Sequence, residues 1–318
     1  MQFMTLPNKL SFGRSILLIT TFLTLGLAFA SSQAGTIVRF STTMGDFSVE
    51  LLDDTAPLTV ANFLNYVNRN DYNGTYLHRV VDDFVVQGGG FRFEPYVGPI
   101  DVPADPPVPN EFNVSNTRGT IAMAKIDGDP DSATSQWFIN LTDNTSLDAD
   151  NGGFTVFGNV LGEGMVILDA IDDLPVVNLG SKASSAPFAS ESYDSDPGNF
   201  VYVNVEVVSR FSSAPSVFEA SSGLLLTTVN IDDGDQLISM NFNAVSGTED
   251  FVIQANLESV IWRRDTVDGM ASYSSADEKL RIPSLEVNSN GTVVLVENLV
   301  FALSNRSPLQ FTLESYDQ

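Results

Sequence analysis

Arg79 and Gln87, eight residues apart, are the side chains of this sequence best suited to chemistry, and the only histidine, His78, lies beside them. Histidine titrates near neutral pH and suggests acid–base catalysis, but His78 has no plausible nucleophile as a partner. The three glycines at 88–90 suggest a phosphate loop, yet neither a lysine nor a helix start follows them. A guanidinium stays charged and offers directional donors, so Arg79 is the strongest candidate for a fixed cationic donor.

Both side chains also have ordinary structural explanations. Arg79 could form a surface ion pair with Asp82 or Asp83, as arginines in acidic proteins commonly do. Gln87 could be a hydrogen-bonded amide at a strand edge. The surrounding residues favour a chemical role, because they belong to a longer pattern in the first two thirds of the chain.

Five separated blocks, in a fixed order, closely resemble the cyclophilin-type peptidyl-prolyl isomerases, and the bacterial exported members in particular. The blocks are 56–63, 78–89, 110–111 with 116–124, 132–140, and 157–160 with 164–165, which read APLTVANF, HRVVDDFVVQGG, NE with NTRGTIAMA, SATSQWFIN, and FGNV with GM. The resemblance covers residues 35–210 and implies a mainly β fold, a closed antiparallel eight-stranded barrel capped by two helices. It also implies an enzyme that isomerises X–Pro bonds in proline-containing polypeptide segments, with no cofactor and no metal.

The implied reaction requires stabilisation of a twisted amide. Rotation about an X–Pro bond breaks amide resonance and crosses a barrier of about 18–20 kcal/mol. In the twisted form the prolyl nitrogen becomes pyramidal and basic, so a cationic donor aimed at it lowers the barrier. The resemblance assigns that donor to Arg79, its support to Gln87 and a pocket wall to Phe84.

An apolar pocket must hold the proline ring while the preceding segment rotates. The resemblance places the substrate-binding residues at Val85, Ala124, Lys125, Gln136, Phe138, Leu147 and Phe154. The aromatic side chains could equally be ordinary core, and Ala124 could simply be packed. Ser146 stands where animal members carry a rim tryptophan, and Phe154 where they carry a histidine, so we expect weak affinity for cyclosporin-type inhibitors.

The hydrophobic pattern predicts the elements that would position these side chains. Residues 36–40 and 46–52 alternate weakly around a turn, and a helix begins near Pro57 with apolar residues at helical spacing. Further strands are predicted at 76–81, 85–87, 119–124, 135–141, 155–160 and 200–208, and a second helix at 164–173. Residues 179–199, rich in Ser, Ala, Pro, Gly and Asp, are predicted to form a long surface loop.

The N-terminus and the charge indicate an exported, acidic protein. Lys9 and Arg14 precede an apolar run that ends in the small-residue motif 28–30, which predicts a secretory signal peptide over residues 1–30. The run is short for a bilayer span, so we expect a periplasmic or secreted protein without membrane insertion after cleavage. The net charge of −25 disfavours nucleic acid and anionic membrane as partners. Without cysteine, packing alone must stabilise the protein, which we expect to be a monomer.

The character of the chain changes after position 210. Residues 211–218 are predicted to be a linker and 219–318 a small β-sandwich-like domain of unknown role, with a hairpin turn at 290–291. Trp262, Arg263 and Arg264 could form a recognition patch or a strand edge, and we favour the strand edge. The domain could instead bind a carbohydrate or protein itself, or tether a non-catalytic barrel that only binds proline-containing segments. A purely binding barrel does not need the trio of Arg79, Phe84 and Gln87, which favours the enzyme.

Three acidic turns, at 127–131, 148–151 and 232–235, could bind calcium through oxygen ligands. None of them has the spacing of an EF-hand loop. Turns rich in Asp and Gly are usually solvated, so we favour turns without a metal.

Overall fold

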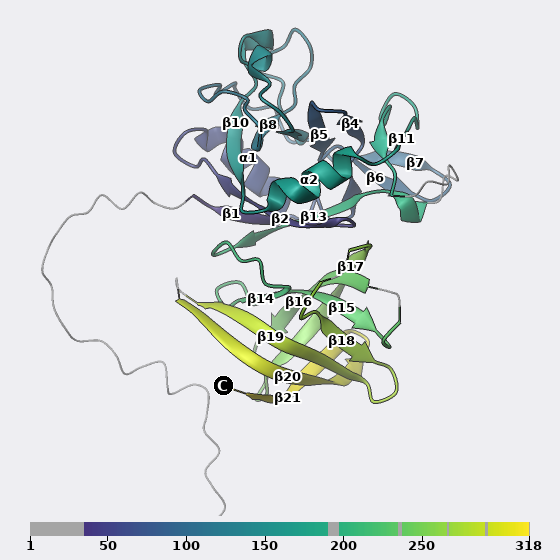
Figure 1. The fold of residues 1–318 in the computed structure, drawn as a ribbon. Coiled ribbons are helices and arrows are strands. Elements are labelled where there is room, and N and C mark those ends of the chain that lie inside the picture. Colours follow the sequence, from purple (N-terminus) through teal and green to yellow (C-terminus); the bar gives the residue numbers. More distant parts are fainter. Residues whose placement is uncertain (1–34, 190–196, 235–236, 266, 290–291, 318) are drawn as a thin grey trace, which may run out of the picture. The chain divides into compact units, whose positions relative to one another are not determined.

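The computed structural model describes residues 35–189, 197–234, 237–265, 267–289 and 292–317, so the predicted signal peptide lies outside the described residues. Two large β sheets with separate hydrophobic cores, together with a two-stranded sheet, are the β structure of this part of the chain (Figure 1). Residues Gly35–Gln318 form one unit, and the predicted boundary at 211–218 stays a prediction. Within the described ranges, no helix has the length and apolarity that a bilayer crossing requires.

The first sheet contains the predicted eight-stranded antiparallel barrel. Its strands are β1 (Ile37–Thr42), β2 (Gly45–Leu51), β3 (Thr75–Tyr76), β4 (Arg79–Val81), β5 (Val85–Gly88), β8 (Thr120–Met123), β9 (Trp137–Asn140), β10 (Val156–Leu161) and β13 (Tyr202–Val208). The order is β4-β5-β9-β8-β10-β2-β1-β13-β3, and each neighbouring pair is antiparallel.

The ring closes through β3 and β4, which are two halves of one strand interrupted at Leu77 and His78. The Leu77 amide donates to the carbonyl of Val201 at 2.9 Å, beside β13, and the His78 amide donates to the carbonyl of Gln87 at 3.2 Å, on β5. With β3 and β4 taken as one strand, eight strands surround the core, as predicted.

Two short hairpins were not predicted. The strands β6 (Phe91–Glu94) and β7 (Gly98–Asp101) extend the sheet to eleven strands beyond β3. The strands β11 (Val176–Val177) and β12 (Ala186–Pro187) pair with each other, and β12 lies inside the predicted surface loop. Strands of two to four residues are too short for a periodic hydrophobic pattern to reveal them.

Both predicted helices are present. α1 (Pro57–Asn68) has proline in its first turn, where the missing N–H has no intrahelical partner to lose, and it buries Val60, Phe63 and Val67. α2 (Gly164–Asp172) buries Leu168 and Ile171. These buried faces pack into the same hydrophobic core as the barrel strands.

Alternation along the strands separates the barrel core from the outer face. On β5 the side chain of Val86 belongs to the core, and on β9 those of Trp137 and Ile139 do. Successive side chains of a strand point to opposite faces, so Gln87 and Phe138 point outward. The outer face of β4, β5, β9 and β8 is therefore the surface on which the predicted site must lie.

The C-terminal sheet is also closed. Its strands are β14 (Ser216–Glu219), β15 (Leu224–Ile231), β16 (Leu237–Val245), β17 (Val252–Arg263), β18 (Ala271–Ser274), β19 (Lys279–Ser289), β20 (Thr292–Arg306) and β21 (Leu309–Asp317). Two parallel pairings, β14 with β19 and β15 with β18, join strands distant in sequence and make the sheet a closed barrel rather than a sandwich. The predicted turn at 290–291 lies outside the described residues, and the pairing of Ser289 with Thr292 confirms the hairpin around it.

Polar side chains join the two sheets along a surface that we call the seam, defined by Asp46, Glu206, Asn241 and Arg263. Arg263 is only 7% exposed, and its guanidinium forms ion pairs with Asp46 on β2 and with Asp265, the latter at 2.6 Å. The second oxygen of Asp46 accepts a 2.6 Å hydrogen bond from Arg39. Arg263 therefore does more than end a strand, because it links β17 to the barrel.

Candidate active site

Four neighbouring strands place the first site residues in one row. Arg79 on β4 lies opposite Gln87 on β5, Gln87 lies opposite Phe138 on β9, and Phe138 lies opposite Ala122 on β8. Directly paired residues point to the same face of a sheet, so this row lies on the outer face of the barrel. Val85 is two residues from Gln87 along β5 and shares that face.

A chain of hydrogen bonds connects the polar members of the predicted site. Arg79 donates from Nη1 to Oε1 of Gln87 at 3.3 Å, and Gln87 donates from Nε2 to Oε1 of Gln136 at 2.9 Å. All three side chains are half-buried. The arrangement holds the guanidinium at the surface of the barrel while leaving it accessible.

The surface ion pair considered for Arg79 does not form. Among the described residues, no salt bridge joins Arg79 to Asp82 or Asp83, and the Asp83 amide instead donates to the Asp172 carboxylate at 3.1 Å. Burial lowers the pKa of Arg79 from its ordinary value. A guanidinium nevertheless remains charged near neutral pH, so Arg79 keeps the property that its predicted role needs.

His78 is a packed neighbour of the polar chain. Its side chain is 4% exposed and meets the ring of Phe91 edge-to-face, with the ring centres 4.8 Å apart. Burial lowers the pKa of His78 to about 4, against a smaller opposing effect of a hydrogen bond with Gln136. The imidazole is therefore neutral at pH 7, which favours the structural role expected for it.

The glycines that follow Gln87 allow close packing against Trp137. A Cβ atom on Gly88 would lie 2.8 Å from the indole ring, and Gly89 has a φ of +77°, which L side chains rarely adopt. Gly88 and Gly89 therefore serve backbone geometry, and Trp137 explains why side chains are excluded there.

The apolar residues of the predicted site gather in a cluster distinct from the barrel core. Val85 and Phe138 are buried in it, and Phe84, Ala124, Leu147 and Phe154 are partly buried against them. Phe138 and Phe154 meet edge-to-face with ring centres 5.7 Å apart. We call this cluster the apolar groove, after the role that the family resemblance assigns to it. Val85 and Phe138 are buried, and the other members keep part of their surface exposed, so the cluster can contact an apolar ring.

Lys125, in the loop after β8, lies beside the groove and is bound to the segment between β9 and β10. Its ammonium donates to the carbonyls of Asn151 and Gly153 at 2.8 and 2.7 Å, and its nitrogen lies 4.8 Å from the centre of the Phe154 ring. The structure thus brings all ten predicted site residues to one side of the barrel, with Lys125 acting on the groove through Phe154.

Of the three acidic turns, 127–131 and 148–151 lie within the described residues, whereas Asp235 of the third turn does not. In the described part of the chain, no group of three or more His, Cys, Asp or Glu side chains could hold a metal ion.

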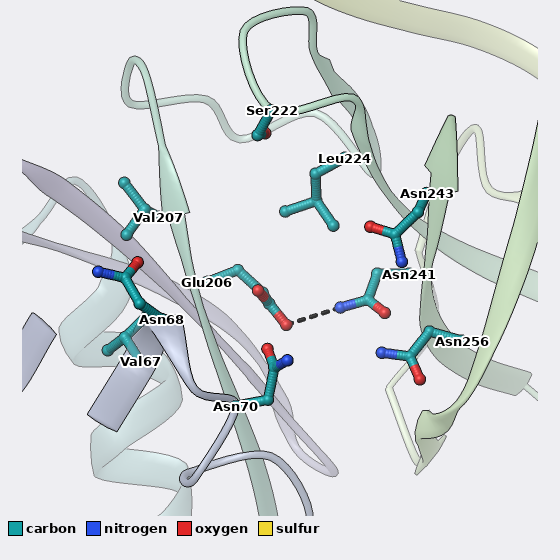
Figure 2. A pocket seen from close by; sticks show the side chains of 10 residues that line it. All are labelled: Val67, Asn68, Asn70, Glu206, Val207, Ser222, Leu224, Asn241, Asn243 and Asn256. Carbon is teal, nitrogen blue, oxygen red and sulfur yellow. Dashed lines mark hydrogen bonds between the residues drawn. The ribbon is translucent and has the colours of Figure 1, made fainter. Parts of the chain in front are cut away.

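The cavity drawn in Figure 2, of about 200 Å³, lies at the seam beside Glu206 and Asn241, away from the groove.

Comparisons with known proteins agree with this geometry. Residues 37–188 match the family model described as cyclophilin type peptidyl-prolyl cis-trans isomerase/CLD. A peptidyl-prolyl cis-trans isomerase of Acinetobacter baylyi is 41% identical over 155 residues, which cover 48% of this chain and 79% of that protein. The chain belongs to the cyclophilin-type peptidyl-prolyl cis-trans isomerase family.

Other proteins are also similar to this cyclophilin. Peptidyl-prolyl cis-trans isomerase B of Escherichia coli is 43% identical over 142 residues, covering 42% of this chain and 83% of that protein. A crystal structure of a Cryptosporidium parvum cyclophilin-type isomerase covers 55% of this chain and 99% of that one, with 22% identity and a TM-score of 0.42. As a member of the family, the protein is a peptidyl-prolyl cis-trans isomerase, and its C-terminal sheet lies beyond the region that the family model matches.

Proposed function

We propose that this cyclophilin accelerates X–Pro isomerisation by electrostatic stabilisation of the twisted amide at Arg79. The observation that supports this mechanism is the hydrogen-bonded row of Arg79 and Gln87 directly beside an apolar groove outside the barrel core. A cationic donor and an apolar ring pocket are the two parts that the reaction needs, and they lie on one face.

In the proposed mechanism the groove holds the proline ring and the guanidinium meets the prolyl nitrogen. As the amide twists, the nitrogen lone pair leaves conjugation and accepts a hydrogen bond that the planar amide cannot accept as well. Arg79 therefore binds the twisted form more tightly than the planar form, which lowers the barrier. Gln87 holds the guanidinium in place, and Gln136 offers its amide to the substrate backbone. No covalent bond to the protein forms.

The test follows the cis–trans relaxation of a short X–Pro peptide with and without the protein. We expect Arg79→Ala to lower kcat/KM on the order of 100-fold or more, as loss of a preorganised donor does in other enzymes. Arg281→Ala is a matched control, because Arg281 forms an exposed ion pair with Asp277 on the C-terminal sheet. Equal acceleration by the wild type and Arg79→Ala would contradict the mechanism.

We further propose that the substrates are unfolded or exported proteins in the periplasm or outside the cell. The support is the pattern of residues 1–30, with two basic residues before an apolar run and a small-residue cleavage motif. Cell fractionation followed by mass spectrometry of the mature N-terminus tests this. A chain that begins at Ser31 in the exported fraction is expected, and an uncleaved protein in the cytoplasm would contradict it.

A further inference from the structure

Three buried asparagines lie behind the apolar groove and form a continuous row of side-chain amides. Asn116 and Asn140 are fully buried, and Asn144 is 6% exposed. Asn144 donates from Nδ2 to Oδ1 of Asn140 at 2.9 Å. Asn140 in turn donates from Nδ2 to Oδ1 of Asn116 at 3.2 Å and to the Thr120 hydroxyl at 2.8 Å.

Each end of this row is attached to a wall of the groove. At one end, Asn144 Nδ2 donates to the carbonyl of Phe84 at 2.8 Å. At the other end, Asn116 Nδ2 donates to the carbonyl of Phe154 at 3.0 Å and to Asp148 at 3.1 Å. The row therefore ties the turn that carries Phe84 to the segment that carries Phe154.

The same row fixes the segment that carries Leu147. The 3₁₀ helix η1 spans Thr145–Asp148, and the Leu147 amide donates to the carbonyl of Asn144 at 2.9 Å. Asp148 accepts a 2.5 Å hydrogen bond from Ser115 and a 2.9 Å bond from the Asn116 amide. One set of hydrogen bonds therefore holds the three segments that carry Phe84, Leu147 and Phe154.

Asn140 occupies the centre of this arrangement. On the outer face it is the direct strand partner of Val85, which belongs to the floor of the groove. A buried amide that loses its partners is strongly disfavoured, so the row has little freedom to rearrange. Spacing between the walls is then set by the length of the amide row and not by the apolar contacts alone.

We propose that Asn140, with Asn144 and Asn116, is a positioning residue that sets the width of the apolar groove and so its selectivity for the five-membered proline ring. This inference rests on the proposed function, because it assumes that the groove holds the ring. None of the three asparagines touches the substrate in this arrangement; they act through Phe84, Leu147 and Phe154.

A purely structural role predicts a different result. If the asparagines only stabilised the fold, their loss would reduce the amount of active protein and lower all activities by the same factor. A change in groove width instead alters the ratio of activities towards rings of different size. One additional methylene in an apolar pocket changes kcat/KM by roughly 10- to 200-fold, so the ratio is a sensitive measure.

The experiment compares two peptides that differ only in the ring, X–Pro and X–pipecolic acid, whose ring has six members. We expect Asn140→Ala to lower the preference for the proline peptide by about threefold or more, mainly through a higher KM for proline. Asn73→Ala is the matched control, because Asn73 is a buried asparagine that donates to Glu206 at 2.8 Å at the seam. It should leave the ratio unchanged.

Asn144→Ala is a second variant in case Asn140→Ala does not fold, and it cuts only the attachment to Phe84 and Asn140. A shifted ratio in either variant supports the proposal, and a ratio equal to that of Asn73→Ala in the folded variants overturns it. If the asparagine variants leave the ratio unchanged while Arg79→Ala abolishes the activity, only the positioning role is overturned. A wild type insensitive to Arg79→Ala would instead overturn the proposed function.

Discussion

The groove and the seam use the same kinds of side chain in opposite ways. At the groove, Arg79, Gln87 and Gln136 are half-buried and form a single line of hydrogen bonds that leaves donors accessible. At the seam, Arg263 and Glu206 are buried, and their charged or polar groups bind partners within the protein. Arg79, the proposed ligand-binding arginine, is supported on one side, whereas Arg263, which joins the two sheets, is enclosed.

The surroundings of Glu206, a buried carboxylate at the seam, extend this comparison. Glu206 is 8% exposed and accepts hydrogen bonds from two neutral amides, Asn73 at 2.8 Å and Asn241 at 2.6 Å, the second of which is drawn in Figure 2. Its strand partner Arg39 lies next to it, but the Arg39 guanidinium binds Asp46 and the carbonyl of Ala214. Burial without a cation raises the pKa of Glu206 to about 7.

The largest expected effect comes from removing the central carboxylate of the seam. Asp46→Ala leaves Arg39 and Arg263 without their shared partner, and breaking a buried ion pair in this way costs roughly 3–5 kcal/mol of unfolding free energy. Urea unfolding at pH 7 measures it, and kcat/KM at a temperature where the variant is folded should be unchanged. Asp277→Ala, which removes an exposed ion pair, should lose at most about 1 kcal/mol. If Asp46→Ala lost activity but not stability, the assignment of the seam to stability and of the groove to activity would be contradicted.

The next effect is the dependence of the unfolding free energy on pH. Glu206 at the seam and His78 beside the groove should change it in opposite directions. The pKa of Glu206 is about 7 in the folded protein against an ordinary 4.5, so its contribution is present below about pH 4.5 and is lost as the pH rises to about 7. The pKa of His78 is about 4 against 6.5, so its contribution is present above about pH 6.5 and is lost as the pH falls towards 4. Each contribution is on the order of 3–4 kcal/mol.

Urea unfolding between pH 4.5 and 7.5 separates the two. Glu206→Gln should gain stability relative to the wild type as the pH rises through this range, because the variant has no carboxyl group to ionise. His78→Gln should gain relative to the wild type as the pH falls. Parallel curves for the wild type and either variant would show that burial of that group has no such effect.

A smaller effect is expected at the groove from loss of the support for Arg79. Gln87→Ala removes the acceptor of the 3.3 Å hydrogen bond and the link to Gln136. We expect kcat/KM for an X–Pro peptide to fall about tenfold, equivalent to about 1.4 kcal/mol, because the guanidinium remains but is less well oriented. The urea midpoint should move little, since Gln87 is half-buried. A large loss of stability with unchanged activity would assign Gln87 to the fold.

The smallest effect concerns the rim of the groove. Lys125→Ala removes the contact with the Phe154 ring and two hydrogen bonds to loop carbonyls, which together order one wall. A cation–π contact at a partly exposed position contributes about 0.5–1 kcal/mol, so kcat/KM should fall only a few-fold. Lys125→Met keeps the packed stem and should recover part of the loss. A change as large as that of Arg79→Ala would mean that Lys125 contacts the reacting bond.

The barrel and its site residues were largely predictable because their signal is local. Pro57 and the apolar spacing after it predict α1, which the structure places at Pro57–Asn68. The family motif then names Arg79, Gln87, Phe84, Val85, Ala124, Gln136 and Phe138, which lie within short blocks of fixed spacing, whereas Leu147 and Phe154 lie between the blocks. Residue order and periodicity suffice where the interacting groups are on neighbouring strands.

The seam, the closure of both barrels and the amide row were decided only by the tertiary structure. Asn204 and Glu206 lie on the polar side of β13, which alternation alone would assign to solvent, yet both are buried. Arg263 meets Asp46 across more than two hundred positions, and β14 meets β19 through a parallel pairing of distant segments. The alternation of residues along a strand predicts which face is polar. It does not predict what packs on that face, because this depends on segments far apart in the chain that only folding brings together.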